Sequence, residues 1–82
     1  MNSNTILSTF LNVEEAKNKN NGERYFILHL LLGNQSCKLY FKDLDLFNQF
    51  KTLSRVTDIV LNVEIILKND ATFTLKPLAF EK

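Results

Sequence analysis

The stretch 23-ERYFILHLLLGNQSCKLYFK-42 decides the fold. Its two arms are rich in aromatic and branched apolar residues, which favour β-strands. Between them lies Gly33-Asn34, a dipeptide that suits a two-residue hairpin turn because both residues tolerate a positive φ. We therefore expect an antiparallel hairpin with strands over residues 23–32 and 35–42.

The apolar residues set the register of this hairpin. If Leu32 lies opposite Gln35, one face carries six apolar side chains. They are Phe26, Leu28, Leu30, Cys37, Leu39 and Phe41. The opposite, outer face carries Tyr25, Ile27, His29, Leu31, Ser36, Lys38, Tyr40 and Lys42. A slip of one residue would mix the two sets, so the first face is predicted to be the core.

The segments on either side of the hairpin predict a further strand and a helix. Residues 5–15 are rich in Ile, Thr, Phe and Val and predict a first strand. Apolar and polar residues alternate too irregularly in it to show whether Phe10 faces the core. A polar loop follows over residues 16–22. Residues 43–54 predict an amphipathic helix with Asp43 as its N-cap. Its apolar face recurs every three residues, at Leu44, Phe47, Phe50 and Leu53.

The last part of the chain returns to an alternating pattern. Residues 58–68 predict a fourth strand with five inward apolar side chains. These are Ile59, Leu61, Val63, Ile65 and Leu67. After a turn at residues 69–70, a fifth strand is expected to place Ala71, Phe73 and Leu75 inward, with Leu78 and Phe80 closing the core. Pro77 should end the ladder or lie on a sheet edge, because proline has no backbone N–H.

The order β-β-β-α-β-β within 82 residues predicts a single domain over residues 1–82. Three antiparallel strands, a helix and a final hairpin are the arrangement of the oligonucleotide/oligosaccharide-binding (OB) fold. The expected fold is thus mainly β, a five-stranded OB-like Greek-key barrel with one helix between strands 3 and 4. A flat α+β sheet with the helix packed across one face is the alternative.

Charge is distributed unevenly along the chain, although the net charge is only +1. Residues 16–42 contain five Lys or Arg and one Glu, whereas residues 43–70 contain three Lys or Arg and five Asp or Glu. The first of these segments can therefore attract an anionic partner, while the whole chain barely does.

Composition speaks against catalysis and against secretion. The chain has one His and one Cys, which the predicted register places on opposite faces, and it has no cluster with metal-ligand spacing and no Gly-rich phosphate loop. We therefore expect no enzyme activity, metal or cofactor. A single cysteine, no basic-then-apolar leader and an apolar stretch of only residues 25–32 predict a cytoplasmic protein without a membrane span.

The outer face of the hairpin and the adjoining loops carry the residue types that bind single-stranded nucleic acid. Flat aromatic rings stack on bases, and cations neutralise phosphates. The predicted nucleic-acid-binding residues are Lys17, Lys19, Arg24, Tyr25, His29, Lys38, Tyr40, Lys42 and Lys68. The expected partner is DNA or RNA in single-stranded form, bound with little sequence preference.

Three short motifs resemble a known family. They are Gly-Glu-Arg-Tyr at residues 22–25, Leu32-Gly33, and Leu-Lys-Pro-Leu at residues 75–78. With the size and strand order, they make the chain similar to the small single-stranded-DNA-binding proteins of phages and plasmids. The resemblance implies a homodimer that holds DNA with aromatic and basic residues, here Arg24, Tyr25 and Tyr40. The predicted helix after the third strand is a departure from that family.

A second interpretation uses the same face for a protein partner. Ile27, Leu31 and Val60 are typical of packing surfaces, and Tyr is as common in protein interfaces as in nucleic-acid sites. The alternative is therefore a phage- or plasmid-type interaction module, which forms a homo-oligomer or binds or inhibits a host protein.

Overall fold

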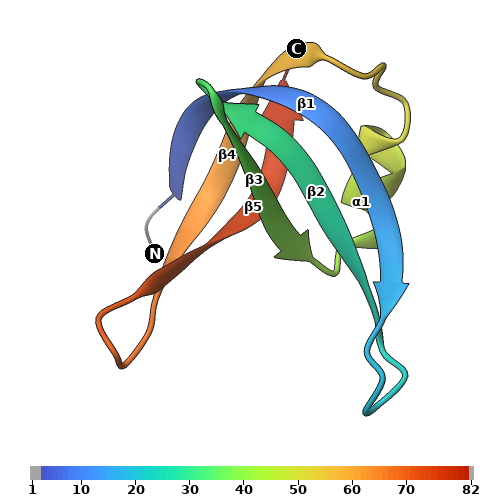
Figure 1. The fold of residues 1–82 in the computed structure, drawn as a ribbon, viewed down its shortest axis with the longest axis vertical. Helices are drawn as coiled ribbons and strands as arrows, with labels where there is room; N and C mark the ends of the chain where they lie inside the picture. The colour runs from blue at the N-terminus through green and yellow to red at the C-terminus, as the bar shows by residue number, and fades with distance from the viewer. Residues whose placement is uncertain (1–2, 82) are drawn as a thin grey trace.

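The computed structural model describes residues 3–81 and shows one antiparallel sheet of five strands with a single helix (Figure 1). The sheet order is β3-β2-β1-β4-β5. The elements are β1 (Ser3–Lys17), β2 (Arg24–Leu32), β3 (Gln35–Phe41), α1 (Leu44–Phe50), β4 (Thr57–Leu67) and β5 (Phe73–Glu81). The mainly β class and the order β-β-β-α-β-β are confirmed.

The central hairpin has the predicted register. Leu32 lies opposite Gln35, Leu30 opposite Cys37 and Phe26 opposite Phe41. Gly33 occupies the turn with a φ of 64°, a conformation that costs glycine little because it has no Cβ. The inward face is the core: its six residues are buried, except Cys37, which is half-buried.

A long first strand joins the two halves of the sheet. The first part of β1 pairs with β4 and its second part pairs with β2. The pairing with β2 shifts register between Phe10 and Asn12, as expected of a bulge, which bends a strand. Phe10, which the alternation did not place, is only 3% exposed and belongs to the core.

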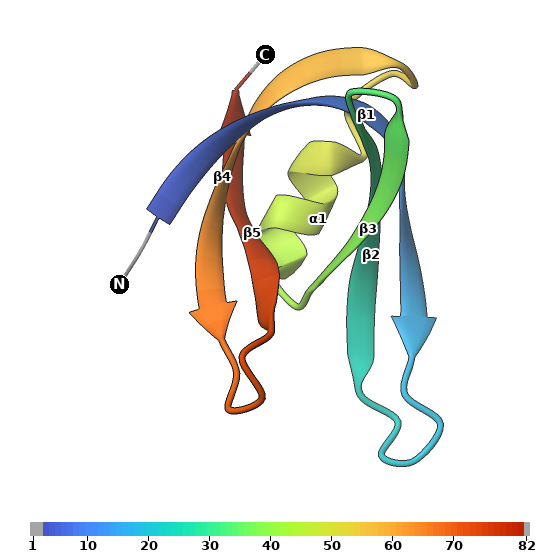
Figure 2. The same ribbon diagram turned by 60° about the vertical axis from the view of Figure 1, so that its left-hand side comes forward.

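The sheet curves around α1, which lies on its concave side (Figure 2). It is not closed into a barrel, because β3 and β5 are its two edges and are not hydrogen-bonded to each other. It is not the flat alternative either. The helix fills the concave side with buried Leu46, Phe47 and Phe50.

The helix is shorter than predicted. Asp43 is the N-cap and its carboxylate accepts a hydrogen bond from the Leu46 N–H at 3.2 Å, but α1 ends at Phe50 instead of continuing to residue 54. Beyond it, the Leu53 N–H donates to the Phe50 carbonyl, the spacing of a 3₁₀ turn. This tighter turn still buries Leu53, while Leu44 at the start is 47% exposed and lies outside the core.

The β4–β5 hairpin corrects several predicted core positions. Leu67 is 74% exposed and Phe73 is 60% exposed, and both lie at the turn end of the hairpin, the part that extends beyond the helix (Figure 1). Alternation predicted their face correctly, but none of residues 3–81 buries that face at this end of the hairpin. Ala71 belongs to the turn and Leu78 is exposed.

Pro77 lies within β5, buried and opposite Val63, next to a register shift at which Leu78 is the extra residue of β5. Because β5 is an edge strand, the expectation of an edge position for Pro77 is confirmed. In the described part of the chain, no helix is long and apolar enough to cross a membrane.

Candidate nucleic-acid interface

A groove of about 680 Å³ lies where the β1–β2 loop meets the end of β3. We call it the tyrosine groove and define it by its lining residues. They are Lys17, Asn18, Lys19, Glu23, Arg24, Tyr25, Tyr40, Phe41 and Lys42. Six of the nine predicted binding residues therefore meet in one place, although they come from three strands, the β1–β2 loop and the connection that follows β3.

Two tyrosines form the aromatic part of the groove. Tyr25 on β2 and Tyr40 on β3 project from the outer face, and their ring centroids are 6.1 Å apart with the planes tilted by 56°. Tyr25 is half-buried, whereas Tyr40 is 57% exposed. The pair thus presents open aromatic surface in a geometry that cross-strand neighbours hold in place.

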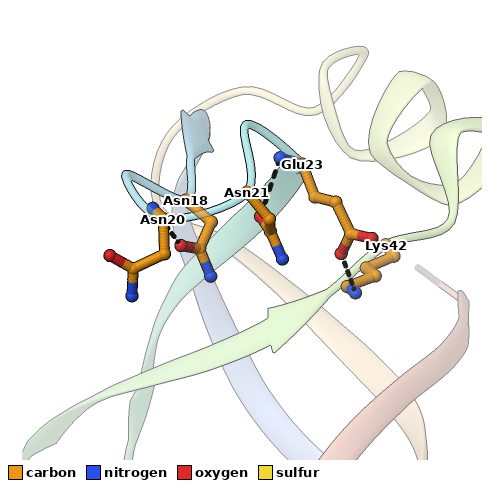
Figure 3. Close-up of polar contacts among 5 residues, drawn as sticks. All are labelled: Asn18, Asn20, Asn21, Glu23 and Lys42. Atoms are coloured by element: carbon orange, nitrogen blue, oxygen red, sulfur yellow. Dashed lines mark hydrogen bonds and ion pairs between the residues drawn. The ribbon is translucent and has the colours of Figure 1, made fainter.

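Hydrogen bonds within the β1–β2 loop fix the rim of the groove (Figure 3). The side-chain oxygen of Asn18 accepts from the Asn20 N–H at 2.8 Å, and that of Asn21 accepts from the Glu23 N–H at 3.0 Å. The Gly22 N–H donates to the Asn18 carbonyl at 2.8 Å, and Gly22 takes a φ of 73°. The turn chemistry of Asn and Gly therefore gives the loop a defined shape.

Four cations and one carboxylate line the groove. The Lys42 ammonium lies 3.0 Å from the Glu23 carboxylate, and the Arg24 guanidinium lies 3.5 Å from Glu15. Among the described residues, Lys17 and Lys19 form no ion pair. Exposed ion pairs contribute little free energy, so Arg24 and Lys42 can exchange their carboxylates for a phosphate at small cost.

Three predicted residues lie outside the groove. His29 is on the outer face, where its Nε2 is 3.0 Å from the Glu14 carboxylate. Lys38 lies opposite His29 on β3 and lines a different cleft. Lys68 immediately precedes the β4–β5 turn, where its N–H donates to the Thr72 carbonyl at 2.9 Å.

The apolar residues of the alternative interpretation are also separate from the groove. Ile27, Leu31 and Val60 are half-buried. Leu31 and Val60 line a shallow depression of about 430 Å³ near the Gly33 turn. This depression is distinct from the tyrosine groove, whereas Ile27 lies opposite Tyr40 and adjoins the groove.

Three residues of the groove wall were not among the predicted binding residues: Asn18, Glu23 and Phe41. Phe41 is a buried core residue that also borders the groove. The sequence contained an indication for Asn18, because an Asn side chain commonly accepts a hydrogen bond from the backbone N–H two residues later. Glu23 had one in the hairpin register, because Phe26 opposite Phe41 brings Glu23 near Lys42, which it contacts at 3.0 Å. The described residues contain no group of three or more His, Cys, Asp or Glu that could hold a metal ion.

The tyrosine groove has to be interpreted from its own chemistry. No protein-family model matches the chain, and no curated protein and no solved structure matches it. The similarity to phage and plasmid proteins stays a prediction from three motifs.

Proposed function

We propose that this protein binds single-stranded nucleic acid in the tyrosine groove. The observation that carries the proposal is the adjacency of two tyrosines, half-buried Tyr25 and exposed Tyr40, and four cationic side chains along one open groove. Single-stranded nucleic acid needs this combination, because its bases are free to stack and its phosphates need counter-charge.

The roles of the residues follow from their positions. Tyr25 and Tyr40 stack on bases, each contact contributing about 1–3 kcal/mol. Lys17 and Lys19 on the rim neutralise phosphates directly, since they form no ion pair among residues 3–81. Because every base has a flat π face, this mode of binding has little sequence preference.

The strand order supports the proposal. The five-stranded antiparallel sheet has one helix between β3 and β4 and has β3 and β5 at its edges, and we propose that it is related to the OB fold. In OB folds, oligonucleotides lie on strands 2 and 3 and on the loops that join strands 1–2 and 4–5. The tyrosine groove occupies the strand 2–3 end and the first of these loops.

The test is fluorescence anisotropy of a labelled oligo-dT of about 20 nucleotides. We expect binding that weakens steeply between about 50 mM and about 200 mM salt, because bound cations release counterions. A duplex of the same length should bind more weakly. The double variant Tyr25→Ala/Tyr40→Ala should lose at least about tenfold in affinity.

Matched variants separate the groove from the rest of the surface. Lys17→Ala/Lys19→Ala should weaken binding and lower its salt dependence, whereas Arg55→Ala, an exposed cation outside the groove, should leave both unchanged. Absence of binding at low salt, or equal affinity of the tyrosine double variant and the unmodified protein, would contradict the proposal.

A further inference from the structure

The open edges of the sheet border a second cleft, of about 370 Å³, which we call the β3–β5 cleft. It is lined by Lys38, Leu39, Tyr40, Ile66, Phe73, Thr74, Leu75 and Lys76. Its residues come from β3 and from the β4–β5 hairpin, the two parts of the sheet that fail to close. Only Tyr40 is shared with the tyrosine groove.

The main chain of β5 is hydrogen-bonded to β4 and to no other described strand, although β3 lies beside it across the cleft. Lys68 and Thr72 close the β4–β5 hairpin with a hydrogen bond of 2.9 Å. Because bonded and non-bonded pairs alternate along antiparallel strands, Thr74 and Lys76 face β4. The N–H and C=O groups of Phe73 and Leu75 therefore point to the free edge, which pairs with no other strand among residues 3–81.

Pro77 limits this free edge. It is the next residue after Leu75 whose backbone faces outward, and it has no N–H to donate. The residues that line the cleft also end at Lys76. The available ladder is therefore short, restricted to the part of β5 nearest the turn, and exposed edges of this kind are templates for pairing with another chain.

The side chains of the cleft are apolar in the middle and basic at the rim. Leu39 is buried and Leu75 half-buried, so the core reaches the surface here, and Phe73 extends it with an exposed ring. Lys38 and Lys76 are exposed and form no ion pair among the described residues, although Lys76 lies opposite Glu64 on β4. No Asp or Glu lines the cleft.

We propose that the β3–β5 cleft binds an extended acidic peptide segment of another protein, which pairs with the free edge of β5 as an added strand. The backbone of the peptide bonds to Phe73 and Leu75, its apolar residues cover Phe73 and Leu39, and its alternate acidic residues meet Lys38 and Lys76. A peptide is favoured over nucleic acid because only a peptide backbone complements the ladder of the edge. The proposal is independent of nucleic-acid binding.

The test uses a fluorescent, capped peptide of alternating Glu and Val and measures its anisotropy with the full chain. We expect a dissociation constant below about 1 mM. Two control peptides, which lack either the negative charge or the backbone pairing, should bind at least about tenfold more weakly. One replaces Glu with Lys. The other carries N-methyl groups on alternate amides and cannot form the ladder.

Two protein variants locate the site. Lys38→Glu/Lys76→Glu should weaken binding of the acidic peptide at least about tenfold, and Phe73→Ala should weaken it too. Leu67→Ala is the matched control: Leu67 lies opposite Phe73 on the same hairpin and is 74% exposed, but it does not line the cleft.

Five outcomes would overturn the proposal. The first is no binding of the acidic peptide, and the second is equal binding of the N-methylated peptide. The third is that Leu67→Ala weakens peptide binding as much as Phe73→Ala does. The fourth is a homodimer, seen by sedimentation, that Phe73→Ala dissociates, because the occupant would then be a second copy. In the last outcome, the Lys38→Glu/Lys76→Glu variant binds oligo-dT more weakly but binds the acidic peptide as before. The cleft would then bind nucleic acid, and the peptide proposal would fail while the tyrosine groove proposal stands.

Discussion

Asp70 holds the β4–β5 turn through contacts with a single neighbour. Its carboxylate accepts from the Thr72 hydroxyl at 2.6 Å and from the Thr72 N–H at 3.3 Å. Between them, Ala71 takes a φ of 66°, a left-handed conformation that is unfavourable for residues with a Cβ. One residue pair thus stabilises a strained turn that positions the hairpin beside the β3–β5 cleft.

The hydrogen bonds lower the pKa of Asp70, and the Thr72 hydroxyl is the main cause. A carboxyl with a lower pKa in the folded state stabilises the fold above its unfolded pKa, and this contribution is lost as the pH falls through the folded pKa. We therefore expect Thr72→Val to move the pKa of Asp70 upward, as measured by NMR titration. An unchanged pKa would show that the backbone contact alone is responsible.

At the level of elements, α1 depends on its first residue more than on its length. Leu44–Phe50 is a helix of only seven residues, and short helices are unstable by themselves because nucleation is costly. Asp43 satisfies the Leu46 N–H, and Asp45 places negative charge in the first turn, where the helix dipole favours it. Capping and packing against the sheet therefore keep the helix folded.

Removal of this cap should be measurable. Asp43→Ala is expected to lower the free energy of unfolding by about 1 kcal/mol, because the partly buried N–H of Leu46 loses its acceptor. Urea unfolding followed by circular dichroism gives the value. Asn48→Ala, an exposed position within α1, is the control and should be neutral or slightly stabilising, since alanine favours helices. Equal losses in both variants would contradict the capping role.

At the level of the whole molecule, Phe50 joins the two halves of the curved sheet. It is fully buried, and its ring centroid lies 4.6 Å from that of Phe80 on β5, 5.7 Å from that of Phe41 on β3 and 5.9 Å from that of Phe10 on β1. Because the sheet is not closed by hydrogen bonds, packing holds its two edges together, both through Phe50 on the helix and through direct contact of β3 with β5.

Truncation of this side chain should destabilise the whole domain. Phe50→Ala is expected to cost about 3–5 kcal/mol, a large share of the stability of a small domain, which is about 5–15 kcal/mol. Phe50→Leu should cost less, because most of the volume remains. Thermal and urea unfolding of both variants give the comparison. A loss below about 1 kcal/mol for Phe50→Ala would mean that the edges do not depend on this contact.

The sequence predicted the elements well and the extent of the core less well. The register of the 23–42 hairpin was predictable because a slip would bury polar residues, and the strand order followed from the alternating patterns. Phe73 and Leu67 were misplaced, because alternation indicates which side of a strand a residue faces and not whether another element covers that side. The helix end was misplaced because Leu53 is buried by a 3₁₀ turn that has nearly the same period.

By itself, the sequence determined what depends on neighbours along the chain: the strands, the Gly33 turn, the Asp43 cap and the alternation of apolar residues. These features follow from local sterics and from the two periods of regular structure. Only the tertiary structure decided that Lys17 and Lys19 meet Tyr40 in one groove, and that the sheet stays open between β3 and β5. The reason is physical: the curvature of the sheet and the space filled by the helix are properties of all the strands together, and no single segment encodes them.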